Sequence, residues 1–288
     1  EAFLATPEVE IAAIAPATVI TGFGGTRRGA ALAGVDPLSK AYMPWVRHGI
    51  LACLDLLFRH GVCHAIVPIP IVELLEEAAG SRARLFAALD WVFAGTETLA
   101  DYVRREWRVR LIGAEGIAEL AATAERLRAA TPSASGPTLW LSVCADAEAP
   151  MRAIIDTALQ TGARTRAEAI RALYGEDIPL ATMLIGFGRP TFTYDLIPPL
   201  LVGRLQCYWM QRPGYGLDER MLRRILYDYA YTRDTGSGTD RSGRYANVQA
   251  QRAAWETDWV LGAGVPLGAF WYPAPFAGPP EESLTHSY

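Results

Sequence analysis

The chain has 288 residues, of which 51% are hydrophobic, and no apolar run is long enough to cross a bilayer. Its formal net charge of -4 and its pI of about 5.7 exclude the extended basic face of a nucleic-acid-binding protein. Any anion site must therefore be local. The four cysteines, Cys53, Cys63, Cys144 and Cys207, are widely spaced and show no C-x-x-C motif. We interpret them as buried, reduced thiols of a cytoplasmic protein.

Short, almost wholly apolar runs alternate with helical stretches along the chain. Apolar runs of four to six residues are typical of strands that are covered on both faces. In chain order, we predict strand 18–23, helix 42–60, strand 64–68, helix 85–105 with a break near Gly95, strand 109–113, helix 120–130, strand 139–144, helices 150–161 and 165–173, strands 183–186 and 206–210, and helix 218–233. This order implies right-handed crossovers and a mostly parallel sheet sandwiched by helices.

Helix start and stop signals support several of these boundaries. Gly61 closes the first helix, Pro150 suits a helix N1 position, and Thr165 with Glu168 has the spacing of a capping box. Segments 132–137 and 234–243 have the composition of loops, and the Gly- and Pro-rich sequence from Gly262 predicts an irregular tail or arm. We predict one α/β domain, residues 1–272, followed by a tail, residues 273–288.

The first strand ends in the sequence GFGGTRRG, residues 22–29. Ligands of open parallel sheets bind beyond the carboxyl ends of the strands, and glycines there let backbone amides approach an anion. Neither a dinucleotide fingerprint nor a Walker loop fits, because Arg27 stands where glycine or lysine would be needed. Two arginines suit a compact anion such as phosphate or diphosphate. The alternative is a turn that carries two solvated arginines.

Two later stretches extend this pattern: LIGFGRPTFTYD (184–195) after a strand and DERMLRRILYDYAYTRD (218–234) after the last strand. Together with GFGGTRRG, LFRHGVCHAIVPI (57–69) and TRAEAIRALYGE (165–176), they resemble the tuberculosinol synthases, also called tuberculosinyl adenosine transferases. That family has the cis-prenyltransferase fold of undecaprenyl diphosphate synthases. The resemblance runs in the same order from about residue 18 to 233 and continues weakly to Tyr272. It implies a six-stranded parallel sheet, a homodimer and an isoprenoid diphosphate as substrate.

The resemblance also implies roles for individual residues. The turn after the first strand would bind diphosphate, and Tyr42 and Arg28 would be catalytic. The implied diphosphate ligands are Gly24, Gly25, Thr26, Arg27, Arg28 and Arg189, with Arg223 and Arg224 as further candidates. The last two arginines are equally consistent with surface charges, since Arg224 and Asp228 have the spacing of an ordinary helical ion pair. Tyr42 would guide or deprotonate the carbocation, or else would simply bond to backbone at the helix start.

Two departures from the family pattern concern its metal ligands. The family's turn begins with an aspartate that positions Mg²⁺, and Gly24 occupies that position here. Gln206 stands where chain-elongating members have a carboxylate. No metal ligand is therefore assigned, and any Mg²⁺ would be bridged by the substrate diphosphate and water. Three acids near strand ends could replace the missing metal ligands: Asp36, Asp146 and Glu148. The alternative is that each is a solvated acid in a loop.

An apolar pocket must hold the prenyl chain, and aromatic faces can stabilise a carbocation. The candidate walls are Trp45, Leu51, Trp91, Phe93, Phe187, Tyr194 and Trp209, each of which could instead belong to the core. The leading hypothesis is a terpene synthase that ionises a C15 to C20 diphosphate, with a bicyclic diterpenyl group, and yields an alcohol, an olefin or a transfer product. The alternatives are a non-catalytic prenyl-diphosphate-binding partner subunit of the same fold and an unrelated phosphate-binding α/β enzyme.

Overall fold

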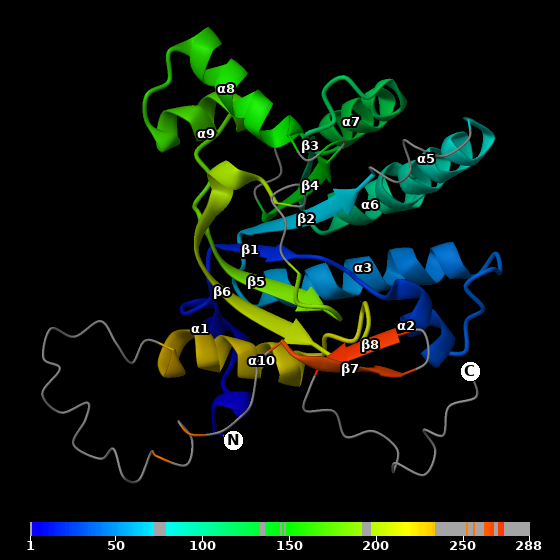
Figure 1. Ribbon diagram of the computed structural model, residues 1–288, viewed down its shortest axis with the longest axis vertical. Helices are drawn as coiled ribbons and strands as arrows, with labels where there is room; N and C mark the ends of the chain where they lie inside the picture. Colours follow the sequence, from blue (N-terminus) through cyan, green and yellow to red (C-terminus); the bar gives the residue numbers. More distant parts are fainter. Residues whose placement is uncertain are drawn as a thin grey trace, which may run out of the picture.

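A six-stranded parallel sheet with helices on both faces forms the centre of the computed structural model (Figure 1). The structure describes residues 2–71, 79–132, 136–144, 146, 148–191, 197–233, 252, 256, 262–267 and 270–273. The strand order in the sheet is β3-β4-β2-β1-β5-β6, so β1 and β2 lie at its centre and β6 is at one edge. The predicted α/β class and the six parallel strands are confirmed.

The six strands cover the predicted ranges, and several are longer than predicted. They are β1 (Thr18–Thr21), β2 (His64–Pro70), β3 (Arg108–Ile112), β4 (Thr138–Cys144), β5 (Ala181–Phe187) and β6 (Val202–Met210). Only β1 is shorter than predicted, because the backbone turns away into the glycine-rich loop after Thr21. All neighbouring pairs are parallel, so the carboxyl ends of β1, β2, β5 and β6 meet at one edge of the sheet.

The helices include all of the predicted ones, together with two short helices early in the chain. They are α1 (Glu8–Ala12), α2 (Thr26–Leu32), α3 (Tyr42–Arg59), α5 (Ala79–Ala94), α6 (Thr96–Arg104), α7 (Ala118–Ala130), α8 (Ala149–Thr161), α9 (Arg166–Tyr174) and α10 (Glu219–Tyr227). The predicted break at Gly95 separates α5 from α6. The capping box is present, with Thr165 accepting from the Glu168 amide. The last predicted helix changes at Asp228 into the π-helical turn η3 (Asp228–Thr232).

Alternation along the strands divides the core into two layers. On one face, Val19, Ala65 and Leu139 pack under α3 and its neighbouring helices. On the other face, Ile20, Ile66 and Trp140 pack under α9 and the short turn η2 (Pro199–Leu201). In Figure 1, α8 and α9 lie at one end of the molecule and α10 lies at the other. Because all four residues of β1 are buried, polar chemistry at this central strand is confined to its ends.

The structure corrects three sequence-based expectations. The chain beyond Gly262 is not wholly irregular, because β7 (Gly264–Leu267) and β8 (Phe270–Pro273) form an antiparallel hairpin. Two short helices that were not predicted, η1 (Ala2–Ala5) and α1, precede the first strand. Cys63 is exposed and Cys207 half-buried, whereas Cys53 is buried as expected; all three are free thiols.

Several further predictions fall on residues outside the described ranges: residues 133–135 of the first predicted loop, all of segment 234–243, the side chain of Cys144 and most of the predicted tail 273–288. Within the described part of the chain, no helix combines the length and apolarity that a bilayer crossing requires.

Candidate active site

The loops that follow β1 and β5 meet around the guanidinium group of Arg28. Gly25 caps α2 with a φ of +76°, and Gly188 follows β5 with a φ of +79°. A Cβ added at Gly25 would lie 2.8 Å from Nη2 of Arg28, and one at Gly188 would lie 3.4 Å from the same atom. Both positions need glycine for their backbone conformation, and Gly25 also needs it for space. The two Gly/Arg motifs of the sequence therefore form one structural unit.

A cavity of about 310 Å³ opens beside this unit at the carboxyl ends of β1, β2, β5 and β6. We call it the central cavity. Its lining residues are Ile20, Gly22, Phe23, Gly24, Pro68, Pro70, Leu184, Ile185, Gly186, Phe187, Arg189, Thr191, Ile197 and Trp209. One wall is held by two hydrogen bonds: the Gly214 amide donates to the Gly24 carbonyl at 2.6 Å, and Trp209 Nε1 donates to the Arg189 carbonyl at 3.1 Å. The cavity is thus apolar, with polar groups gathered at one end.

Tyr42 lies next to the first-strand turn. Its hydroxyl group forms a 2.8 Å hydrogen bond with Oγ1 of Thr26, which joins the first residue of α3 to the first residue of α2. The Tyr42 ring also stacks on Trp45, with 6.5 Å between ring centroids. Tyr42 is therefore held in position from two sides beside the residues predicted to bind diphosphate.

A row of aromatic rings connects Tyr42 with the central cavity. Trp45 packs edge-on against Tyr215 at 5.2 Å, Tyr215 packs against Phe23 at 5.4 Å, and Phe23 packs against Phe187 at 6.2 Å. Burial raises the pKa of Tyr215, and the neighbouring Tyr42 and Cys53 add to this effect. Tyr215 is therefore neutral throughout the physiological range. This wall offers π faces and no fixed charge.

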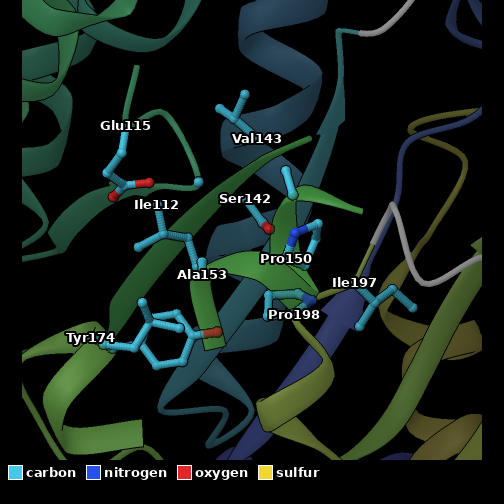
Figure 2. A pocket seen from close by; sticks show the side chains of 12 residues that line it. Ile112, Glu115, Ser142, Val143, Pro150, Ala153, Tyr174, Ile197 and Pro198 are labelled. Carbon is cyan, nitrogen blue, oxygen red and sulfur yellow. The ribbon is translucent and has the colours of Figure 1, made fainter. Parts of the chain in front are cut away.

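A second cavity, of about 150 Å³, lies beyond the ends of β3 and β4 (Figure 2). We call it the lateral cavity. Ile112, Val143, Pro150, Ala153 and Pro198 give it a mainly apolar wall, and Ile197 lines both this cavity and the central one. Figure 2 shows Tyr174 and Ser142 on its wall, each with a hydroxyl group. Burial raises the pKa of Tyr174, and Glu115 raises it further, so this side chain stays protonated.

The predicted arginines separate into two groups. Arg189 lines the central cavity, Arg28 lies against Gly25 and Gly188 beside it, and Arg27 is an exposed residue in the first turn of α2. Arg224 is exposed and lines a different groove, with Trp209 and Arg233.

Arg223 points elsewhere and is 7% exposed. Its guanidinium group pairs with Glu219 at 2.8 Å and donates to the carbonyls of Leu4 and Thr6. These contacts give Arg223 a structural role, in which it anchors the N-terminal segment to α10.

The predicted pocket walls are also divided. Phe187 and Trp209 line the central cavity, and Trp45 belongs to the aromatic row beside it. Leu51 and Phe93 are buried in the core between α3, α5 and the sheet. Trp91 is 42% exposed on α5. Tyr194 lies outside the described residues.

The acids proposed as substitute metal ligands do not line the central cavity, and no described lining residue is acidic. Asp36 is exposed and accepts from the Leu38 amide at 2.9 Å. Asp146 accepts from the amides of Glu148 and Ala149, both at 2.7 Å, and pairs with Arg152. Glu148 also pairs with Arg152. Mg²⁺ prefers several oxygen ligands in octahedral geometry, so the described residues that line the central cavity do not fit a Mg²⁺ ion held by protein side chains.

Sequence reasoning missed part of the site. Phe23, Tyr215 and Ile197 contribute to the walls, and Pro68 and Pro70 close the end of β2. Pro68 carried a usable signal, because it ends the predicted strand 64–68 at the edge of the sheet where ligands bind. Tyr215 carried none, since its contact with Trp45 depends on how the loop after β6 folds back over α3.

The strand order and the helices around the sheet are those of the cis-prenyltransferase fold. Solved structures agree. The lavandulyl diphosphate synthase of Lavandula x intermedia, in complex with dimethylallyl diphosphate, has a TM-score of 0.52 and 13% identity, covering 76% of this chain and 97% of that one. A probable undecaprenyl diphosphate synthase from Campylobacter jejuni has a TM-score of 0.55 and 12% identity, covering 75% and 95%.

The sequence comparisons identify the family. The (+)-kolavelool synthase of Herpetosiphon aurantiacus is 40% identical over 272 residues, 94% of each chain. The tuberculosinyl adenosine transferase of Mycobacterium tuberculosis is 29% identical over 289 residues, 94% of this chain and 96% of that one. No model of a protein family matches the chain. The chain belongs to the family of these two enzymes, and the predicted resemblance and enzymatic class are confirmed.

Proposed function

We propose that the protein is a diterpene synthase that ionises a bicyclic diterpenyl diphosphate, releases pyrophosphate and adds water to the carbocation. Kolavelool is an alcohol, as the ending of its name states, and its synthase is 40% identical to this chain. The transferase that uses adenosine as acceptor is 29% identical. Water is therefore the acceptor that we assign. The observation that carries the proposal is the position of Arg28 between the two glycine turns at the central cavity.

The first step is binding of the diphosphate group. Arg28 Nη2 lies against the two glycine turns, Arg189 lines the central cavity, and Arg27 is exposed in the first turn of α2. Guanidinium forks match phosphate oxygens in pairs. Each charge-assisted hydrogen bond contributes about 1.5 to 3 kcal/mol. Bonds of this kind strengthen as negative charge accumulates on the departing oxygens, which is how a preorganised site lowers the barrier to ionisation.

The hydrocarbon part of the substrate occupies the apolar region of the central cavity. Phe187, Ile197 and Trp209 form its walls, and Ile197 also lines the lateral cavity. Burial of hydrocarbon contributes about 0.8 kcal/mol per methylene group, so a bulky skeleton supplies more binding energy than any single polar contact. The shape of these two cavities then selects among hydrocarbon skeletons.

Ionisation breaks the allylic C–O bond, and the electron pair leaves with pyrophosphate. The resulting cation faces the aromatic row, whose π faces attract positive charge. Tyr42, fixed by Thr26, orients the attacking water, which forms the new C–O bond. The proton that this water loses passes to pyrophosphate, whose oxygens are the most basic in the site.

The described residues do not hold Mg²⁺, and no step above requires it. Any Mg²⁺ would be bound by the diphosphate oxygens and by water, as the sequence predicts. We also propose that the protein is a cytoplasmic homodimer, in line with the implications of the family resemblance.

The proposal is tested by incubating the purified protein with geranylgeranyl diphosphate and with bicyclic labdadienyl and halimadienyl diphosphates. We expect pyrophosphate release with a bicyclic substrate, an alcohol product, and incorporation of oxygen from ¹⁸O-labelled water. A transferred nucleoside product would assign a different acceptor. Pyrophosphate release from none of these substrates would contradict the proposal.

A further inference from the structure

His60, which follows the last residue of α3, contains an unexplained buried polar atom. The side chain has 0% exposure, and its Nε2 has no hydrogen-bond partner among the described residues. Nδ1 lies 2.9 Å from the Leu56 carbonyl oxygen. Because a carbonyl oxygen only accepts, Nδ1 carries the proton and Nε2 presents a lone pair. Buried polar atoms in native proteins nearly always have a partner, so this lone pair needs one.

Two carboxylates approach this nitrogen from other parts of the chain. Oε1 of Glu219, in the first turn of α10, lies 3.8 Å from Nε2. Glu8, in the first turn of α1, completes the group, and one ligand atom from each of the three residues lies within 4.8 Å of the others. The separations exceed a hydrogen bond, but they are close to those of ligands around one metal ion.

We propose that Glu8, His60 and Glu219 form a binding site for a divalent transition-metal ion of the Zn²⁺ class. Ligand bonds of about 2.1 Å in tetrahedral geometry place ligand atoms roughly 3.4 Å apart. A small movement of the two glutamate side chains gives this spacing. Imidazole nitrogen favours Zn²⁺ and similar ions, whereas Mg²⁺ and Ca²⁺ take oxygen ligands. Water supplies the remaining coordination.

The surroundings of the three residues resemble the outer shell of a metal site. The bond from Nδ1 of His60 to a backbone carbonyl fixes the ring and its tautomer, as is usual for metal-binding histidines. Arg59 pairs with Glu8 at 2.7 Å, and Arg223 pairs with Glu219 at 2.8 Å. A carboxylate has about four lone-pair sites, so each can keep its arginine and bind an ion. Since the two arginines balance the two carboxylates, we expect micromolar affinity.

The proposed ion would join three elements that are distant in the sequence. α1, the end of α3 and α10 meet at this point, and Arg223 already ties the carbonyls of Leu4 and Thr6 to α10. A bound ion stabilises the state that binds it, so it would hold the N-terminal segment on the body of the protein. None of the three ligands lines the central or lateral cavity, and the site is independent of the proposed reaction.

The test uses the full chain without an affinity tag, stripped of metal by a chelator that is then removed. Zn²⁺ is titrated by calorimetry, thermal unfolding is recorded with and without Zn²⁺, and Co²⁺ serves as a spectroscopic substitute. We expect one equivalent to bind, Tm to rise, and a visible Co²⁺ ligand-field band to appear. In the variant Glu8→Gln, affinity falls by at least about tenfold and the Tm rise is lost.

Two matched variants separate metal binding from loss of the ion pair. Arg59→Gln breaks the same pair with Glu8 but keeps the carboxylate, so Zn²⁺ affinity stays equal or increases. Glu10→Gln changes an exposed acid of the same helix outside the cluster, and affinity is unchanged. Absence of saturable Zn²⁺ binding at millimolar concentration would overturn the proposal. Binding that is equal in Glu8→Gln and the wild-type protein would do so as well, since it would place the ion elsewhere.

Discussion

Replacement of Arg28 by alanine tests the diphosphate site most sharply. Nη2 of Arg28 lies against both glycine turns, and a guanidinium fork binds a phosphate group through two N–H groups. Two charge-assisted bonds of about 1.5 to 3 kcal/mol each give a loss of about 3 to 6 kcal/mol. At 1.4 kcal/mol per decade, this is a decrease of about 10² to 10⁴ in kcat/KM. Arg28→Lys keeps the positive charge but lacks the guanidinium fork, so its kcat/KM should lie between that of the wild type and that of Arg28→Ala.

The assay measures pyrophosphate release over a range of substrate concentrations, together with calorimetric binding of inorganic pyrophosphate. Arg152→Ala is a matched control, because it removes an exposed arginine that pairs with Asp146 and Glu148 away from the central cavity. We expect the control to retain wild-type kinetics. A folded Arg28→Ala variant with kcat/KM and pyrophosphate affinity equal to those of the control would refute the assignment of Arg28.

Three further changes probe other parts of the structure. Tyr42→Phe should lower kcat about 100-fold with little change in KM, because it removes the hydroxyl group that bonds to Thr26; a wild-type kcat in this variant would contradict the role assigned to Tyr42. Arg223→Ala should lower the free energy of unfolding in urea by about 2 kcal/mol, because it leaves the backbone carbonyls of Leu4 and Thr6 without this donor. Unchanged stability together with weaker pyrophosphate binding would instead assign Arg223 to the diphosphate site. Burial lowers the pKa of His64, with Glu176 opposing the shift, so the unfolded chain binds more protons. The free energy of unfolding should then fall as pH drops below the usual value of 6.5, and a fall just as steep in His64→Gln would contradict this account.

Much of the fold could be predicted because its signals are local. Apolar runs covered on both faces identified all six strands of the main sheet, and Gly95 and the pair Thr165 and Glu168 located helix boundaries. The hairpin of β7 and β8 was missed because Gly and Pro hide its strand pattern. The helices before β1 were missed because α1 spans only five residues, too few to show a period.

Only part of the candidate site could be predicted, because the sequence does not show in which direction each side chain points. The glycine turns that surround Arg28 stood out, since positive φ angles require glycine in both. Arg223 and Arg224 are adjacent in the sequence, but successive helical residues point in different directions. One is buried against Glu219 and the other is exposed, and nothing in the sequence distinguished them. The same limit applies to Trp91 and Trp209, which have the same residue type in different surroundings.

A crystal structure of the protein soaked with inorganic pyrophosphate, or with a non-ionising substrate analogue, would show directly whether the turn around Arg28 binds diphosphate. We expect phosphate density in contact with the Arg28 guanidinium group between Gly25 and Gly188, and we expect the hydrocarbon of the analogue in the central cavity. Density for the diphosphate at another place, or an empty turn at saturating pyrophosphate, would contradict this expectation.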